Sequence, residues 1–294
     1  DGNHITTKST EDTNVTEIAE LMVGRKIEKI SRKANQEEKE AIMNIKDLEV
    51  QMPGEEVKSL DLEIKKGEII GIGGLAGHGK VGVANGIMGL YPSKGEVKIN
   101  GQNLQLNDPK KSMAHQLAFV SEDRRGVGLL MDESIEMNIV INSIHNQEKF
   151  LNKLGPFNLK NSGKIRKHAL KMIEDLDIRC TGPKQIVRHL SGGNQQKVCV
   201  ARALTMNPDI LFVSEPTRGI DVGAKKLVLD TLVELNEELG MTVVMTSSEL
   251  GELRSICDRI AIVTEGEIAG ILKPEDADAD YGLLMSGEKR GKGA

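Results

Sequence analysis

A glycine-rich segment that ends in a lysine and a valine, Gly74-Leu-Ala-Gly-His-Gly-Lys-Val81, has the G-x-x-x-x-G-K spacing that wraps phosphate groups. Glycines let backbone N–H groups point inward around phosphate oxygens, the following helix adds partial positive charge, and Lys80 reaches the terminal phosphates. We expect the His78 side chain to face solvent. The alternative is a glycine-rich turn without a ligand. The candidate binding residues are Gly74, Leu75, Ala76, Gly77, His78, Gly79, Lys80 and Val81.

A second anion site is indicated at Leu190-Ser-Gly-Gly-Asn-Gln-Gln196, directly before a segment with the apolar spacing of a helix. Backbone amides at a helix start, together with the Ser191 hydroxyl, form a natural site for an anion. The candidates there are Ser191, Gly192, Gly193, Asn194 and Gln195.

A carboxylate follows the apolar run at residues 210–213, where the chain continues as Ser214-Glu-Pro-Thr-Arg-Gly-Ile-Asp221. A carboxylate at the tip of a buried parallel strand is well placed to orient an attacking water. Glu215 is therefore the candidate catalytic residue.

The elements that must position these residues are a mixture of strands and helices. Some strands alternate apolar and polar residues, which is typical of half-buried strands, and others are short apolar runs typical of strands buried on both faces. Glu265-Gly266 predicts a hairpin turn, and residues 130–190 carry helix patterning. The predicted strands are residues 42–48, 57–64, 68–73, 210–213, 242–246, 259–263 and 267–272.

Composition excludes several classes of function. The 294 residues include 39 basic and 44 acidic side chains, and a net charge of −5 argues against a nucleic-acid binder that relies on bulk charge. The chain has no run of about 18 apolar residues, so no membrane span is predicted. Three widely spaced cysteines fit a reducing, intracellular setting. The six histidines are scattered and form no metal-ligand pair.

The two ends of the chain differ from its middle. Residues 1–15 are polar and predict a loop or short hairpin, residues 16–23 have helical spacing before Gly24, and residues 25–40 predict a solvated linker. We expect a piece of a longer polypeptide; the alternative is a native N-terminal arm from which Met has been removed. The acidic residues 275–280 predict a loop, and the chain after Ser286 predicts a frayed tail.

The three motifs, in this order, resemble those of the ATP-binding subunits of ABC transporters, and the resemblance covers residues 41–273. It implies an α/β P-loop NTPase fold: a RecA-like, mostly parallel sheet with helices on both faces, an antiparallel β subdomain and a small helical subdomain. Lys80 and Ser191 are 111 residues apart, which leaves no room for the long coiled coil of chromosome-maintenance ATPases. The implied division is 1–40 for the tail of a preceding nucleotide-binding half plus linker, 41–275 for the nucleotide-binding domain with its helical subdomain at about 130–190, and 276–294 for a C-terminal tail.

Further segments are similar to one branch, the monosaccharide importers that carry two ATPase halves on one chain. Residues 119–129 resemble the E-D-R-x-x-x-G-L stretch of their second half, and residues 194–196, 217–223 and 247–250 match it as well. Residues 17–25 resemble the end of the first half. The resemblance implies that the chain is the tail of the first half followed by the whole second half.

The resemblance also assigns roles to single residues. Two nucleotide-binding domains of this family dimerise head to tail, and each ATP lies between the glycine loop of one and the signature of the other. Gly74 to Lys80 would cradle the phosphates, and Glu215 would polarise the water. Ser191 and Gly193 would contact the γ-phosphate held by the partner. Asp221 matches the aspartate that communicates across the dimer.

Four positions depart from the active pattern of the family. Val81 replaces the hydroxyl that binds Mg²⁺, and Ser214 stands in place of the aspartate that holds Mg²⁺ through water. Ser248 replaces a histidine that contacts the γ-phosphate, and Glu122 replaces a glutamine that joins metal, water and membrane partner. Residues 42–73 also lack the aromatic that stacks on adenine. We expect this half's own site to be slow or inactive, while its signature completes an active site with the other half.

The implied function is that of an ATP hydrolase subunit, with ATP and weakly held Mg²⁺, which drives import of a monosaccharide or related small solute. Its implied partners are a second nucleotide-binding half (upstream on the same polypeptide, or a second copy), membrane permease subunits and, indirectly, a periplasmic or extracellular solute-binding protein. The implied location is peripheral, on the cytoplasmic face of the cell membrane. Nucleic acid is not among the implied partners. One alternative is a regulatory half that binds nucleotide without hydrolysis. The other is a soluble ABC-type ATPase of translation or DNA repair, which the acidic balance and the E-D-R stretch disfavour.

Overall fold

A computed structural model describes residues 40–154 and 157–287, together with Thr6, Thr7, Ser9 and Thr13. The expectations of a helix at residues 16–23, of a tail from a preceding half and of a linker before residue 40 lie outside the described residues. The expectation of a frayed tail beyond Gly287 lies outside them too.

The centre of the fold is a six-stranded sheet in the order β12-β11-β3-β10-β9-β6. Its first five strands in chain order run parallel, and β12 pairs antiparallel with β11 through the turn at Glu265-Gly266, as the sequence predicts. The apolar runs of the central strands are buried on both faces, which is why they show no alternation. The strands are β3 (Ile69–Gly73), β6 (Leu117–Val120), β9 (Ile210–Ser214), β10 (Thr242–Thr246), β11 (Arg259–Thr264) and β12 (Glu267–Leu272).

Successive residues of these strands belong to two different cores. Leu211 and Val213 pack in the core shared with the larger helices, whereas Ile210 and Phe212 pack in a core shared with a second, antiparallel sheet. That sheet has the order β2-β1-β4-β5, and its alternating strands confirm the prediction for residues 42–48 and 57–64. Its strands are β1 (Ala41–Val50), β2 (Val57–Lys65), β4 (Ser93–Ile99) and β5 (Gln102–Asn103).

Helix α2 (Lys80–Ile87) lies on the face of the parallel sheet that the antiparallel sheet also covers, and all eight of its residues are buried. The packing is very close, because a Cβ at Gly86 would lie 2.3 Å from a methyl carbon of Val50. Helices α6 (Gly192–Thr205), α7 (Val222–Leu239) and α8 (Leu250–Ile256) belong to the other core. The parallel sheet therefore has helices on both faces, as expected.

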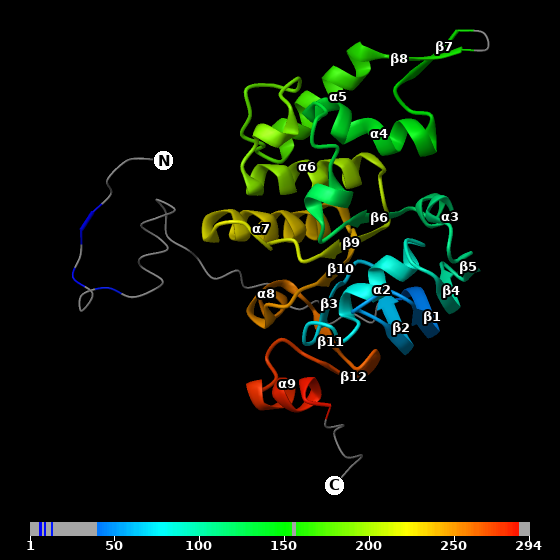
Figure 1. Cartoon of the computed structure of the whole chain (residues 1–294), viewed down its shortest axis with the longest axis vertical. Helices are drawn as coiled ribbons and strands as arrows, with labels where there is room; N and C mark the ends of the chain where they lie inside the picture. The colour runs from blue at the N-terminus through cyan, green and yellow to red at the C-terminus, as the bar shows by residue number, and fades with distance from the viewer. Residues whose placement is uncertain (1–5, 8, 10–12, 14–39, 155–156, 288–294) are drawn as a thin grey trace.

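The helical segments within residues 130–190 gather at one end of the molecule, beyond α6 (Figure 1). They include α4 (Ile135–Gln147), α5 (Ser162–Asp175) and the single turn η3 (Val187–His189), with α3 (Pro109–Ala114) and the turn η2 (Arg124–Gly128) before them. A hairpin of β7 (Leu151–Leu154) and β8 (Phe157–Lys160) joins α4 to α5. The helix patterning of residues 130–190 did not indicate this hairpin.

The acidic segment near the end of the described chain is not a loop throughout. Helix α9 (Asp278–Met285) begins within the residues 275–280 for which a loop was expected, so that expectation is wrong from Asp278 onward. Tyr281 is 1% exposed, and its hydroxyl donates a hydrogen bond to the Lys273 carbonyl at 2.7 Å. Asp278 forms an ion pair with Arg254. The buried Tyr281 and Leu284 stabilise this helix against β11 and β12, although the local sequence is rich in loop-forming acidic residues.

Asn138 of α4 holds several segments together from a fully buried position. Its side-chain oxygen accepts hydrogen bonds from the Leu130 amide at 2.9 Å and the Arg202 guanidinium at 2.6 Å. Its side-chain amide donates to the carbonyls of Leu130 and Ser134, both at 3.0 Å. Asn138 therefore joins α4 to α6 and to the segment after η2.

We expect Asn138→Leu to lower the free energy of unfolding by about 2–4 kcal/mol, because it leaves the buried Leu130 amide without its acceptor and removes one of the two Asn138 oxygens that accept from the Arg202 guanidinium. Urea denaturation measures this change. Asn142→Leu, one turn along the same helix on a pocket wall, is the matched control and should change stability by no more than about 1 kcal/mol. Equal losses in both variants would contradict a specific role for Asn138.

Candidate functional site

The glycine loop joins the end of β3 to the start of α2, as predicted. Gly79 has a φ of 97°, and a Cβ there would lie 2.5 Å from the Glu56 carbonyl oxygen, so only glycine fits this turn. Lys80 is 1% exposed and donates a hydrogen bond to the Leu75 carbonyl at 3.3 Å. The lysine side chain thus folds back along the loop that it follows.

His78 lies at the tip of the glycine loop but does not face solvent as expected. Its side chain is half-buried, and its Nδ1 accepts a hydrogen bond from the Glu265 amide at 3.4 Å. The Gly266 amide donates to the His78 carbonyl at 3.0 Å. The β11–β12 turn therefore packs against the glycine loop and limits the freedom of this imidazole.

The amides of the glycine loop are engaged by an acid that the sequence did not single out. The Glu55 carboxylate accepts hydrogen bonds from the amides of Gly77 at 2.8 Å, Gly79 at 3.0 Å and Val81 at 3.2 Å. Glu55 lies in the turn between β1 and β2, and its sequence neighbours, Pro53-Gly54 and Glu56, indicate only a turn. Three amides of residues 77–81 therefore converge on the two oxygens of one carboxylate.

Glu215 follows β9 at the carboxyl edge of the parallel sheet. Its backbone has a φ of 46°, in the left-handed region that side chains rarely adopt, and its amide donates to the Thr246 carbonyl at 2.8 Å. Ser248, just after β10, donates from its hydroxyl to the Glu215 carboxylate at 2.6 Å. Because β3, β10 and β9 are neighbours, this pair and the glycine loop lie at the same edge of the sheet.

The donors present fit a metal ion poorly. Val81 offers only a methyl-bearing side chain at the start of α2, and it is buried. Ser214 is fully buried, and its hydroxyl has no hydrogen-bond partner among the described residues. Mg²⁺ prefers charged oxygen ligands in near-octahedral geometry, and a neutral hydroxyl replaces the expected carboxylate here. Within the described residues no group of three or more His, Cys, Asp or Glu side chains is placed to hold a metal.

Glu122 connects the exit of β6 to the helix that follows the glycine loop. Asn85 of α2 donates from its side-chain amide to the Glu122 carboxylate at 3.4 Å, and the Ser121 hydroxyl donates to the other oxygen at 3.4 Å. The carboxylate is half-buried. Glu122 thus lies next to α2 and directly before η2.

The signature residues form the start of α6, on different elements from the glycine loop. Ser191 is the exposed N-cap, and its hydroxyl accepts a hydrogen bond from the Asn194 side chain at 2.9 Å. The Asn194 side-chain oxygen in turn accepts from the Arg179 amide at 2.9 Å. Gln195 is 2% exposed and donates to the carbonyls of Val187 and Leu190. The exposed Ser191 at the start of α6, called the Ser191 edge below, is therefore held in place by the hydrogen bonds of Asn194 and of the buried Gln195.

The two signature glycines allow α6 to approach the turn after Glu215. A Cβ at Gly193 would lie 2.7 Å from the Ala224 Cβ, and one at Gly192 would lie 3.2 Å from the Gly219 carbonyl oxygen. Asp221 caps α7 by accepting a hydrogen bond from the Ala224 amide at 2.9 Å. The signature and Asp221 thus belong to one packed corner, while the glycine loop and Glu215 form the other part of the site.

A buried acid links these two parts. Glu252, at the start of α8, is 8% exposed and accepts hydrogen bonds from the hydroxyls of Thr217 at 2.5 Å and Ser247 at 2.9 Å. Lys225 of α7 lies 3.4 Å from the same carboxylate and also pairs with Glu249. Glu252 therefore connects the turn after Glu215 to the segment that carries Ser248.

Burial, the largest influence, raises the pKa of the Glu252 carboxyl above its ordinary value of 4.5. The folded protein then binds this proton more tightly than the unfolded chain does. The stability that the group contributes is complete below about pH 4.5 and is lost as pH rises through the raised pKa. We expect Glu252→Gln to flatten that fall in unfolding free energy above about pH 4.5. Urea denaturation at several pH values measures this dependence of the unfolding free energy on pH. As a control, Glu238→Gln removes an exposed acid on α7 and should leave the dependence unchanged.

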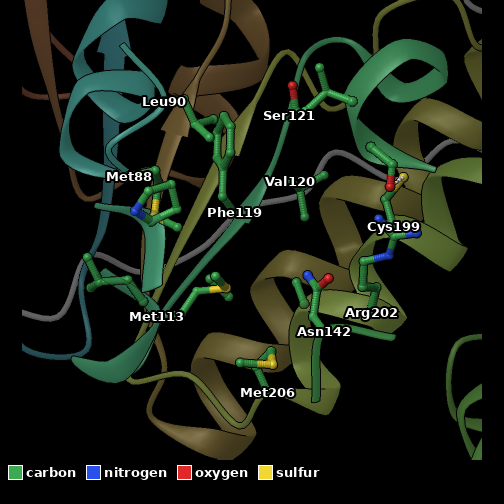
Figure 2. A pocket seen from close by; sticks show the side chains of 16 residues that line it. Met88, Leu90, Met113, Phe119, Val120, Ser121, Asn142, Cys199, Arg202 and Met206 are labelled. Atoms are coloured by element: carbon green, nitrogen blue, oxygen red, sulfur yellow. Dashed lines mark hydrogen bonds between the residues drawn. The ribbon is translucent and has the colours of Figure 1, made fainter. Parts of the chain in front are cut away.

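A pocket of about 180 Å³ opens beside the exit of β6, next to Ser121. Figure 2 shows Phe119 and Leu90 on one wall and Cys199 and Arg202 on the opposite wall. The remaining wall is largely apolar, with three methionines among its residues (Met88, Met113 and Met206). Flexible thioether side chains fill irregular contacts well, so the pocket offers an adaptable apolar recess near Glu122.

Comparisons with known proteins fit this geometry. A family profile described as ABC transporter matches residues 57–218. The nucleoside import ATP-binding protein NupA of Lactococcus lactis subsp. cremoris is 35% identical over 290 residues, or 97% of this chain and 56% of that protein. The ribose import ATP-binding protein RbsA of Lactococcus lactis subsp. lactis is 38% identical over 287 residues, with 97% and 56% covered. The chain spans about half the length of these curated relatives.

Solved structures show the same fold. The dimeric structure of a post-hydrolysis state of the ATP-binding cassette MJ0796, bound to ADP and Pi, has a TM-score of 0.66 and 27% identity. The likeness covers 80% of this chain and 100% of that one. It confirms the predicted α/β fold of a P-loop NTPase. Among the described residues, no helix combines the length and the apolar character needed to cross a membrane.

Proposed function

Because this chain belongs to the ABC transporter family, we propose that it is an ATP-binding part of an importer that takes up a monosaccharide or a related small solute. The observation that carries the proposal is the anion-binding state of the glycine loop: three of its amides converge on two oxygens of one carboxylate. Amides in this arrangement suit phosphate oxygens equally well. ATP is the phosphate ligand that the family membership indicates.

We propose further that Gly74 to Lys80 hold the phosphates, and that Glu215 orients the water with Ser248 as its hydrogen-bond partner. The Ser191 edge of α6 is exposed, so it is available to a nucleotide held by another nucleotide-binding domain. Asp221 lies beside that edge at the start of α7. These positions support a head-to-tail arrangement in which the chain lends its signature to a partner's site.

The donors around the chain's own glycine loop support a site that hydrolyses ATP slowly or not at all. Phosphoryl transfer depends on Mg²⁺ to absorb developing charge, and Val81 and Ser214 supply neither the usual hydroxyl nor the usual carboxylate. The same two residues favour the second candidate function, a regulatory half that binds nucleotide without hydrolysis. The net charge of −5 does not favour the third candidate function, an ATPase associated with nucleic acid.

The proposed partners are a second nucleotide-binding half, membrane permease subunits and, through them, a solute-binding protein outside the membrane. The chain would then work as a peripheral subunit on the cytoplasmic face of the cell membrane. The apolar pocket beside Glu122 is a suitable place for a permease segment, because Glu122 is hydrogen-bonded to Asn85 of α2, the helix that follows the glycine loop. Relatives named for nucleoside and ribose import are 35% and 38% identical to this chain, so these similarities favour no single cargo.

The test compares ATP turnover by the isolated chain with turnover by the complete polypeptide assembled with its membrane subunits in proteoliposomes. We expect the isolated chain to be at least about 100-fold slower, the scale of losing transition-state charge stabilisation. We also expect the assembly to accumulate a sugar or nucleoside only with ATP. Equal turnover by the isolated chain would refute the impaired site, and assembly without ATP-driven uptake would refute the importer role.

A further inference from the structure

The turn between β1 and β2 lies directly on the glycine loop. A Cβ at Gly82 would lie 2.1 Å from the Glu55 carbonyl oxygen, and a Cβ at Gly79 would lie 2.5 Å from the Glu56 carbonyl oxygen. The absence of side chains at these two loop and helix positions is what allows the turn to approach. The antiparallel sheet therefore presents residues 52–56 to the phosphate-binding amides.

The Glu55 carboxylate occupies those amides as an anionic ligand would. Its Oε1 accepts from the Gly77 amide, and its Oε2 accepts from the amides of Gly79 and Val81, at 2.8–3.2 Å. Hydrogen bonds from amides to a charged oxygen are stronger than those between neutral groups. A phosphate that enters the loop must take these same three donors, so it cannot bind while Glu55 remains in place.

The turn is held at its base and is exposed at its tip. Its base is held by the Gln51 amide, which donates to the Pro92 carbonyl at 2.9 Å, and by the Lys58 amide, which donates to the Gly266 carbonyl at 3.0 Å. Between them Pro53 and Gly54 are exposed, and a Cβ at Gly54 would meet nothing within 4 Å. Glu55 can therefore leave the loop through rotation of its side chain, without breaking the sheet.

We propose that Glu55 is an internal competitor for the phosphate site and sets the affinity of this half for nucleotide. The inference rests on the proposed function, because it identifies ATP as the ligand that displaces the carboxylate. Nucleotide binding then includes the loss of three charge-assisted hydrogen bonds and places a triphosphate next to an expelled acid. Both effects weaken binding relative to a loop without such an acid.

The test titrates a fluorescent ATP analogue, without Mg²⁺, against the wild-type chain and the variants Glu55→Gln and Glu55→Ala. We expect at least about tenfold tighter binding in Glu55→Ala, and a smaller gain in Glu55→Gln, which keeps one acceptor oxygen but no charge. Glu49→Gln removes the same charge from an exposed position on β1 and should stay within about twofold of wild type. A gain of the same size in Glu49→Gln would assign the effect to overall charge and overturn the proposal.

A thermal shift with inorganic pyrophosphate separates competition from a merely structural role. In Glu55→Ala the three amides lose their acceptor, so we expect a lower melting temperature that pyrophosphate restores, with little shift in wild type at the same concentration. If wild type and Glu55→Ala bind nucleotide equally well, the proposed role of Glu55 is overturned and the proposed function is left intact. Failure of every variant to bind nucleotide or pyrophosphate would overturn both the competitor and the chain's own nucleotide site.

Discussion

Exchange of Gly193 for Asp lowers ATP turnover of the assembled protein by at least about 100-fold, if the start of α6 completes a site on a partner domain. Two physical effects act together. A side chain at this position meets the Ala224 Cβ, which lies 2.7 Å from where a Cβ would be, and so displaces α6 from α7. The added carboxylate also repels the γ-phosphate that the Ser191 edge is proposed to contact. Steady-state phosphate release measures the loss.

The matched control is Gly163→Asp. Gly163 is the second residue of α5 as Gly193 is the second residue of α6, but it is exposed and far from any proposed nucleotide contact. Its turnover should remain within about twofold of wild type. Because Gly193→Asp also strains the fold, Ser191→Glu serves as a second variant: Ser191 is exposed and its side chain makes no cap hydrogen bond to the helix. Normal turnover in Ser191→Glu would contradict the composite site.

Introduction of a hydroxyl at Val81 and a carboxylate at Ser214, the two proposed metal positions, is expected to make nucleotide binding depend on Mg²⁺. In the wild-type chain, ATP affinity should differ by less than about threefold between Mg²⁺ and EDTA, because neither Val81 nor Ser214 offers a charged oxygen. In the double variant Val81→Thr, Ser214→Asp we expect at least about tenfold tighter binding with Mg²⁺. Thr246 is the register partner of Ser214, and its hydroxyl has no partner among the described residues, so it is free to donate to the new carboxylate.

Equilibrium titration of labelled ATP with and without Mg²⁺ makes this measurement, at a nucleotide concentration high enough to displace Glu55. The matched control is Val83→Thr, the same exchange at a buried valine two residues further along α2. It should leave the response to Mg²⁺ unchanged. A wild-type affinity that already rises tenfold with Mg²⁺ would show that other groups hold the metal.

Much of this fold could be predicted because its signals are local. Residues 210–213 and 242–246 are apolar without interruption, which a strand buried on both faces requires, and residues 57–64 alternate because one face of the antiparallel sheet is exposed. Helix α9 was not predicted, because its stability does not come from local sequence signals. Its stability comes from the burial of Tyr281 and Leu284 against distant strands, and its first residues are acidic and resemble a loop.

The candidate site divides in the same way. Glycine spacing, a lysine ahead of an apolar helix, and a serine-glycine pair at a helix start are short-range patterns, so the amino-acid sequence is enough to single out the loop, Glu215 and the signature as candidates. The exchanged residues Val81 and Ser214 are visible in the sequence as well. The pairing of Glu215 with Ser248 spans 33 residues and depends on β9 and β10 being neighbours in the sheet.

The chain's own order of residues thus determined which candidate chemistry is present: a glycine loop, one carboxylate at a strand tip and a serine-glycine pair at a helix start, with Val81 and Ser214 at the two proposed metal positions. Only the tertiary structure shows that the Glu55 side chain contacts the glycine loop. The contact is between two segments that are distant in the sequence, and neither segment carries a sequence pattern that predicts it. Local backbone preferences act over a few residues, whereas the closeness of the β1–β2 turn to Gly79 and Gly82 results from the packing of one sheet on another.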